Sequence, residues 1–459
     1  MASVSADLST ERGPPLSIPL RHFVVSTGIP LVGVAVGLAD LVAPMPGALL
    51  AHVHLLLAGW VCVTIMGAMT QFVPVWSGVD LYSRWLATAQ LPLAVAGVLG
   101  MAAALLAGRL AWLSVAGLLL LAGLWTMVYN VGRTLRRARP LDVTERHFAF
   151  ALACFVVVPA MGVVLASGYV LPVLGPATVT RTELAGAHVT LAVFGAVLAT
   201  VVGALYQLAT MFTGTELRGV DVPLQRLEAV AYPAGVVTLA AGRLFEVVAV
   251  ARLGAALVLF GLAAVAVVLA HRLLASTVEP SAMHRRYAVV AVALPTWVAW
   301  TAPAWLADPT APDALLGPPG AVHLLTFGAV GFVVLGTLYH VVPFLVWVHR
   351  YADLLGLEPV PLVDELYDAR LARADLLALS AGLVGLVLAD GLGLPRGVRI
   401  AAGLLVVAGF AVYSLNVLLV VRRHAPGSLR GVLDGRGDAA PPEGGAQGTA
   451  TEDRGTAGR

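Results

Sequence analysis

Long apolar runs follow one another along almost the whole chain, with short polar or charged segments between them. Each run is long enough to cross the hydrocarbon core of a bilayer as an α-helix. Lipid offers no hydrogen-bond partners to the backbone, so such runs must form helices. The pattern therefore predicts an all-α membrane protein of about twelve transmembrane helices. The runs are Ile18–Leu41, Gly47–Val75, Trp85–Ala107, Leu110–Gly132, His147–Leu171, Glu183–Phe212, Leu227–Val248, Leu253–Leu274, Tyr287–Leu306, Gly320–Val348, Leu376–Leu394 and Ile400–Val421.

The two ends of the chain lack this pattern. Residues 1–17 are polar and of mixed charge, and the run that follows has no small-residue cleavage site, so we expect a cytoplasmic leader followed by a retained span. Residues 425–459 contain too few apolar side chains to form a core, which predicts a disordered cytoplasmic tail. The membrane domain should occupy residues 18–424.

Composition and charge agree with a membrane protein and exclude several other classes. Of the 459 residues, 59% are apolar and only 12% are charged, which no ordinary soluble domain matches. A formal net charge of +2 indicates no nucleic-acid partner, and the lipid bilayer is the expected surrounding. The two cysteines, Cys62 and Cys154, lie in separate apolar runs, so a disulfide framework or zinc finger is excluded.

Arginines are concentrated in the segments after the fourth, eighth and twelfth runs, all on the side of the N-terminus. Positive charge in short loops marks the cytoplasmic face. We therefore expect a multi-pass protein of the cytoplasmic membrane with both termini in the cytoplasm. The arginines are Arg133, Arg136, Arg137, Arg139, Arg272, Arg285, Arg286, Arg422 and Arg423.

An internal repeat relates the second, sixth and tenth runs. In each, four positions recur at spacings of eight, four and three residues. Small residues at such positions let neighbouring helices approach closely. The repeat predicts three pseudo-repeats of four helices, about 18–132, 147–274 and 287–421; a chance match between glycine-rich helices is the alternative. The positions are Gly59, Gly67, Gln71 and Pro74; Gly195, Gly203, Gln207 and Thr210; Gly328, Gly336, His340 and Pro343.

Four histidines occupy only two positions of this repeat. His52 and His188 lie fifteen residues before the second glycine, whereas His54 and His323 lie thirteen before it. Positions two apart on a helix diverge by roughly 200°, so His52 and His54 must face different neighbours. Histidine in lipid is costly and often functional. Taken singly, each could equally be a hydrogen-bonded packing residue.

These motifs resemble those of subunit I of the heme-copper oxidase superfamily, which has twelve spans in three pseudo-repeats. The segment VHLLTFGAVGFVVLGTLYHVVP at 322–343 looks like the C-type oxidase helix with a His-x-His pair. The segments AHVHLLLAGW, FVPVWSG and FTGTEL are similar to the NnrS family of heme and copper membrane proteins linked to nitric oxide. The resemblance implies a heme b held between His52 and His323.

The same resemblance shows what the chain lacks. The high-spin heme of an oxidase needs a histidine where this chain has Ala321. Its copper needs one at Thr190 and an adjacent pair on the seventh run, where Glu228–Pro233 contains none. A competent oxygen reductase is therefore not expected, and no catalytic residue is assigned.

In the superfamily, the outer histidine position of one central helix faces the inner position of the next. Applied here, the rule gives three arcs. His52 pairs with His323, His188 pairs with His54, and Ala321 pairs with Thr190 without any ligand. The second pair would bind a second heme, a copper ion, or nothing beyond mutual hydrogen bonds.

The function implied is electron transfer, or nitric oxide or respiratory metabolism, with an extracytoplasmic cytochrome c or copper protein as redox partner. Arg396 and Arg399 would bind heme propionates or remain solvated, and Asp390 and Glu246 would be interfacial or part of a proton relay. Two alternatives stay open: a transporter that uses intramembrane histidines, and a heme-based sensor or assembly factor. The runs show no deep acidic residue, which favours cofactor binding over transport.

Overall fold

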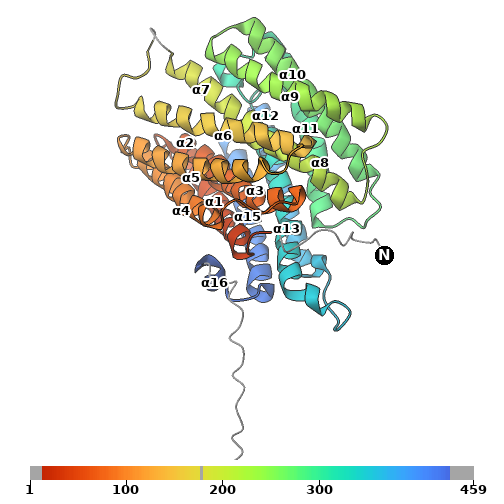
Figure 1. Ribbon diagram of the computed structural model, residues 1–459. Coiled ribbons are helices and arrows are strands. Elements are labelled where there is room, and N and C mark those ends of the chain that lie inside the picture. The colour runs from red at the N-terminus through yellow and green to blue at the C-terminus, as the bar shows by residue number, and fades with distance from the viewer. Residues whose placement is uncertain (1–12, 176–178, 435–459) are drawn as a thin grey trace, which may run out of the picture.

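The computed structural model describes residues 13–175 and 179–434, and over these it is helical, without any β-strand (Figure 1). Most of the expected leader and tail therefore lies outside the described residues. Eleven helical segments are long and apolar enough to cross a membrane. They are Ser17–Val42 (α1), Ala48–Ser77 (α2 and α3), Arg84–Leu106 (α4), Trp112–Leu135 (α5), Val143–Ser167 (α6), Arg181–Thr213 (α7 and α8), Val248–Leu274 (α10), Ala282–Ala307 (α11), Ala321–Leu354 (α12 and α13), Ala369–Gly391 (α14) and Arg396–His424 (α15).

Helix α9 (Asp221–Leu244) is the exception among the expected spans. Its 24 residues would reach across a bilayer, but Arg226, Glu228 and Arg243 lower its mean hydropathy, and it is not among the eleven. It packs antiparallel along α10. Eleven of the expected spans are thus confirmed by length and composition.

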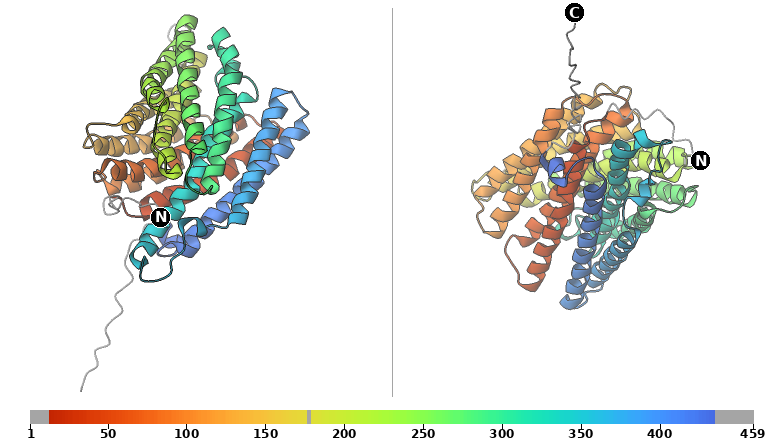
Figure 2. Two further views of the ribbon diagram at one scale, coloured as in Figure 1. Left: turned by 90° about the vertical axis from the view of Figure 1, so that its right-hand side faces the viewer. Right: turned by 90° about the horizontal axis from the view of Figure 1, so that it is seen from below.

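The helices form three groups of neighbours arranged in a ring, α1–α5, α6–α10 and α11–α15 (Figures 1 and 2). In each group a first helix (α1, α6 or α11) is followed by a central segment (α2–α3, α7–α8 or α12–α13), a third helix (α4, α9 or α14) and a fourth helix (α5, α10 or α15). Helix α5 packs on α6, α10 on α11, and α15 returns to pack on α1. The hydroxyl of Ser414 donates to the carbonyl oxygen of Thr27 across this last junction, at 2.8 Å. Within the groups, the pairs α4–α5, α9–α10 and α14–α15 pack tightly along their length. A β-carbon built on Gly123 would lie 2.6 Å from the backbone nitrogen of Ala94, so this approach requires glycine.

Three long central segments share an interruption at one position. Each changes from α-helix to a π-helical turn of eight residues and then back. Every turn begins twelve residues before the second glycine of the sequence pattern. Such turns are rare, and those that occur often lie at functional sites. They are Leu55–Cys62 between α2 (Ala48–His54) and α3 (Val63–Ser77), Leu191–Leu198 between α7 (Arg181–Thr190) and α8 (Ala199–Thr213), and Leu324–Gly331 between α12 (Ala321–His323) and α13 (Phe332–Tyr351).

The two ends of the bundle differ in composition. We call the end with the starts of α2, α7 and α12 the histidine end, and the end with the α5–α6 and α10–α11 connections the arginine-rich end. The expected tail starts at the arginine-rich end with a short helix, α16 (Leu429–Asp434), which packs on α1 and buries Val432 (Figure 1). Residues 429–434 thus form a short helix in a segment whose composition predicts disorder.

Candidate functional site

His52 and His323, which come from different central helices, line one cavity of about 340 Å³ at the histidine end. Their imidazoles lie close enough to interact electrostatically. The cavity lies at the junction where α15 and α14 approach α1, between the first and last helix groups. The structure thus brings together two residues that the resemblance implied would face each other.

The orientation of His52 is set by its neighbour α1. Its Nδ1 donates a hydrogen bond of 2.7 Å to the carbonyl oxygen of Gly33. A β-carbon on Gly37 would lie 2.6 Å from the same nitrogen, so the absence of a side chain there makes room for the imidazole. Because Nδ1 is the donor, Nε2 keeps its lone pair. Histidine ligands to metals are commonly fixed in this way.

His323 is held differently. Its Nε2 lies 2.8 Å from Oδ2 of Asp390 on α14, and Nε of Arg399 lies 3.4 Å from the other carboxylate oxygen. The side chains of His323 and Asp390 are 26% and 25% exposed, so the pair is accessible from the cavity mouth. Asp390 and Arg399 both belong to the cavity wall. Arg396 does not, and instead donates to the carbonyl oxygen of Val42 at the end of α1.

Aromatic rings form much of the remaining wall. Trp60, Phe327 and Phe410 line the cavity, and the rings of Trp60 and Phe410 meet edge to face at 5.0 Å. Trp60 is only 3% exposed, yet its Nε1 finds no hydrogen-bond partner within the described part of the chain. A buried N–H without an acceptor is rare in proteins. It is the kind of group that a bound molecule with an acceptor oxygen would satisfy.

His54 and His188 form a second pair of imidazoles within electrostatic reach. Nδ1 of His188 donates to the carbonyl oxygen of Val158 on α6 at 3.1 Å, and Nδ1 of His54 donates to that of Leu50 at 2.8 Å. Val158 holds the same place relative to His188 as Gly33 does relative to His52, eleven residues after a buried histidine of its helix. Both rings of the second pair therefore also keep Nε2 free.

The third arc, which lacks histidine, is filled by an arginine. Thr190 accepts a 2.7 Å hydrogen bond from Arg243 of α9, whose Nε donates to the carbonyl oxygen of Pro309. The guanidinium lies 5.0 Å from the ring centroid of Trp305. Ala321 is fully buried. Arg243 thus supplies a hydrogen-bond partner to Thr190 in the arc that has no histidine.

Metal clusters of higher order are absent from residues 13–175 and 179–434. No three His, Cys, Asp or Glu side chains gather there as a metal-binding group. Each histidine pair thus contributes two imidazoles and no third ligand of this kind. Cys62 and Cys154 are buried free thiols, as expected for core residues.

A polar triad at the arginine-rich end recurs in all three helix groups, and the sequence analysis did not identify it. One member of each triad lies on the first helix of its group and packs on the second glycine of the central helix. The second member lies on the central helix, three positions after that glycine, and the third member lies on the third helix. The members are His22, Thr70 and Gln90; His147, Tyr206 and Glu228; and Arg286, Tyr339 and Asp375.

The second and third triads each contain a buried carboxylate. Nε2 of His147 lies 3.1 Å from Oε1 of Glu228, and the hydroxyl of Tyr206 donates to Oε2 at 2.9 Å. In the third, Arg286 and the hydroxyl of Tyr339 donate to the two carboxylate oxygens of Asp375. All the charged side chains are at most 1% exposed.

The first triad is uncharged. The amide nitrogen of Gln90 lies 3.1 Å from Nε2 of His22 and donates to Thr70 at 3.2 Å. His22 also donates from Nδ1 to the carbonyl oxygen four residues earlier, as do His147 and Arg286 in their triads. The backbone anchor is therefore the same in all three groups, although the side chains differ.

These triads correct one expectation. Acidic residues do lie buried inside the helices: Glu228 and Asp375 are 0% exposed and lie about two turns from the start of α9 and α14. Tyr206 and Tyr339 are the hydrogen-bond partners of these carboxylates. The equal offset of Thr70, Tyr206 and Tyr339 from the glycines was the available sequence signal.

Comparison with known proteins adds no family. No family model matches the chain, and no curated protein matches it.

Proposed function

We propose that the chain is an integral membrane heme protein, built like subunit I of the heme-copper oxidases, that binds a b-type heme between His52 and His323 and transfers electrons. The observation that carries the proposal is the shared cavity. Two histidines from different central helices line it, with aromatic walls and an arginine at its mouth. Three separate features, namely residue type, position in the repeat and spatial proximity, favour the same pair.

The architecture assigned here is twelve spans in three pseudo-repeats. It is supported by the ring of helix groups, by the three π-helical turns in one register and by the three polar triads. In this account α9 is the twelfth span. Glu228 and Arg243 do not face lipid, because both are buried against protein, and the exposed Arg226 lies in the second turn of α9, near the arginine-rich end.

The residues at the cavity suit a heme in chemical type. Two imidazoles are the usual axial pair of a low-spin b heme, and an apolar, aromatic wall tunes its potential. Arg399 and the Nε1 of Trp60 offer donors to carboxylate oxygens of a bound group. The contact between His323 and Asp390 is the feature that must rearrange, because it uses the ring nitrogen that would otherwise be free.

When bound, such a heme supplies a one-electron redox centre. The hydrogen bond from Nδ1 of His52 to the carbonyl oxygen of Gly33 fixes the tautomer of the ring, so Nε2 keeps the lone pair with which it would bind iron. Two histidine ligands leave no open coordination position, so electron transfer is favoured over activation of a substrate. With the arginine-rich end in the cytoplasm, the cavity opens toward the outer face, where a cytochrome c or copper protein could exchange electrons.

The visible spectrum of the purified protein tests the proposal. We expect a reduced-minus-oxidised spectrum of b type and a pyridine hemochrome of heme b. His323→Ala and His52→Ala should each remove the heme of this pair, whereas His349→Ala, on the same central helix as His323 but at the arginine-rich end, should leave the heme content unchanged. A colourless wild type expressed with sufficient heme would exclude the proposal.

The second pair, His54 and His188, extends the proposal to a second heme. Both rings keep Nε2 free, and a copper site would need further ligands that the described residues do not gather. The hemochrome should then report two hemes per chain, falling to one in His188→Ala. One heme per chain in both proteins would limit this pair to mutual packing. Gas binding by the reduced protein would identify a sensor instead of an electron carrier.

One observation favours a second candidate function, proton-coupled transport. His323 and Asp390 form a partly exposed pair in an open cavity, which is also how transporters carry protons. Purified protein in liposomes with a pH gradient would then dissipate it, and Asp390→Asn would stop the flux. Heme in the wild type together with a tight proton barrier would reject this candidate.

A further inference from the structure

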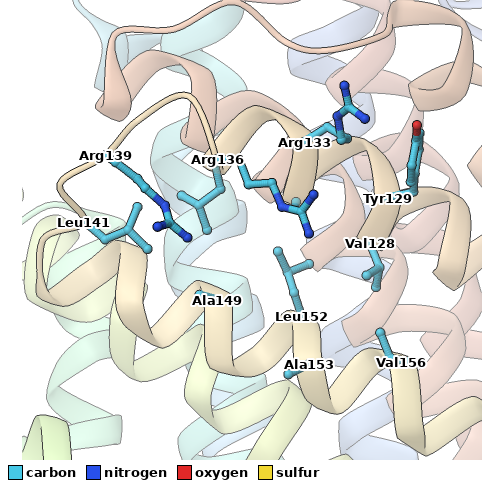
Figure 3. Close-up of a pocket in the computed structure, with 12 residues that line it drawn as sticks. Val128, Tyr129, Arg133, Arg136, Arg139, Leu141, Ala149, Leu152, Ala153 and Val156 are labelled. Carbon is cyan, nitrogen blue, oxygen red and sulfur yellow. The ribbon is translucent and has the colours of Figure 1, made fainter.

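A second cavity, of about 400 Å³, lies between α5 and α6 at the arginine-rich end, away from all four histidines of the repeat (Figure 3). Its rim carries Arg133, Arg136 and Arg139. Its floor is apolar and includes Leu152, Ala153 and other small or aliphatic side chains of the two helices. The cavity therefore combines positive charge at the membrane surface with an apolar groove that runs between two spans.

The arginines of this rim are not neutralised by the protein. No carboxylate of residues 13–175 and 179–434 forms an ion pair with any of them. Arg133 stacks on Tyr82 and Tyr129, at 4.7 and 5.8 Å from the ring centroids. Figure 3 shows Arg136 and Arg139 extending instead over Leu152 and Ala149, into the space between the helices.

The equivalent junction between α10 and α11 provides a contrast. There Arg272, at the end of α10, forms an ion pair with the buried Asp221 and donates to the carbonyl oxygen of Glu216. His271 contacts the other oxygen of Asp221 at 2.8 Å. At the α10–α11 junction a carboxylate of the protein thus pairs with the arginine, whereas at the α5–α6 junction no carboxylate of the described residues pairs with the rim arginines.

The groove is also open toward lipid. Tyr129 and Val156, which line it, are 50% and 41% exposed. A hydrogen bond of 3.0 Å joins the two helices beside this groove, from Nε1 of Trp125 on α5 to the carbonyl oxygen of Val156 on α6. This bond closes the groove toward the membrane centre and leaves the part beside the arginines open. Basic pockets between spans are typical binding sites for anionic lipid headgroups.

We propose that this cavity binds the phosphate headgroup of an anionic phospholipid through Arg136 and Arg139, with an acyl chain along the apolar groove between α5 and α6. Guanidinium groups pair with phosphate oxygens through two parallel hydrogen bonds. The exposed Ala153 leaves the width that an acyl chain needs. The site fixes the α5–α6 junction, where the first helix group meets the second, to the lipid leaflet at the arginine-rich end.

Native mass spectrometry of the delipidated full chain, titrated with phosphatidylglycerol, tests the proposal. Arg136→Gln/Arg139→Gln should weaken lipid binding about 30-fold, equivalent to about 1 kcal/mol for each arginine near the surface. Arg285→Gln/Arg373→Gln removes two exposed arginines at the same end that line no such cavity, and should leave binding unchanged. Phosphatidylcholine should bind weakly to all three proteins.

A second variant separates a built site from general surface charge. Ala153→Trp fills the groove without changing charge, and should also reduce phosphatidylglycerol binding at least about tenfold, that is by about 1.4 kcal/mol. Circular dichroism and thermal unfolding in detergent would establish that each variant is folded. Equal binding by the control and rim variants, no effect of Ala153→Trp, or displacement of the lipid by millimolar inorganic phosphate would each overturn the proposal.

Discussion

The three helix groups carry different kinds of polar contact at the two ends of the bundle. At the arginine-rich end every helix group carries a filled polar triad with its hydrogen bonds made inside the protein. At the histidine end two arcs hold imidazole pairs with a free ring nitrogen or an adjoining cavity, and the third is filled by Arg243. The triads stabilise the packing of the ring through internal hydrogen bonds, whereas the two histidine arcs leave imidazole nitrogens for a bound ligand. Substitutions in the triads should therefore change mainly the stability of the protein, and substitutions in the histidine arcs should change mainly its heme content.

The largest expected effect is on the third triad. Arg286→Met leaves Asp375 buried without its cation, which should lower the free energy of unfolding by about 3–5 kcal/mol. Thermal unfolding in detergent would measure it. The double variant Arg286→Met/Asp375→Leu should recover most of the loss, because no uncompensated charge remains. A double variant as unstable as the single one would show that the pair is not the source.

The second triad should respond less. Glu228→Gln keeps the shape but weakens the contacts with His147 and Tyr206, and we expect a loss of about 1–3 kcal/mol. The uncharged first triad supplies the matched control. Gln90→Leu should lower stability by only about 1 kcal/mol, since it removes neutral hydrogen bonds. Equal losses in both variants would mean that charge plays no part.

Arg243 tests the third arc of the histidine end. Arg243→Met removes the hydrogen bonds to Thr190 and to the carbonyl of Pro309, and should lower the free energy of unfolding by about 1–2 kcal/mol. Heme content should not change, because neither histidine pair contacts this arginine. Loss of heme in this variant would argue that the arcs are not independent.

The smallest effect on stability is expected at the histidines themselves. In the cofactor-free protein, His52→Ala should lower the free energy of unfolding by no more than about 1 kcal/mol, the net contribution of one hydrogen bond to Gly33. The same holds for His188 and its bond to Val158. A loss comparable to that of the Arg286 variant would place the histidines among the packing residues.

The sequence allowed much of the frame to be predicted. Apolar runs located the helices, and the glycine spacing identified the three central segments that share a π-helical turn. The expected meeting of His52 with His323 and of His54 with His188 agrees with their proximity. The helices and the central segments were accessible because their patterns repeat within single helices, whereas the pairing of histidines from different helices was implied by the resemblance to the oxidase superfamily.

What could not be predicted depends on contacts between distant segments. The triads use different residue types in each group, and only their members on the central helices share a fixed offset from the glycines. Loops of different length separate the other members, so no fixed spacing reveals the whole triad. The partners of Asp390 and Arg243 follow from helix packing and not from local pattern. Helix α9 was expected from its apolar residues, but the charges it buries against its neighbours keep it outside the range of an ordinary span.

One measurement addresses the central claim most directly: the pyridine hemochrome of the purified wild type beside His52→Ala, His323→Ala and the folded control His349→Ala. The account predicts heme b in the wild type and the control, and the loss of one heme per chain in both site variants, which should remain folded. An unchanged heme content in the two site variants, or no heme in the wild type supplied with heme, would contradict it.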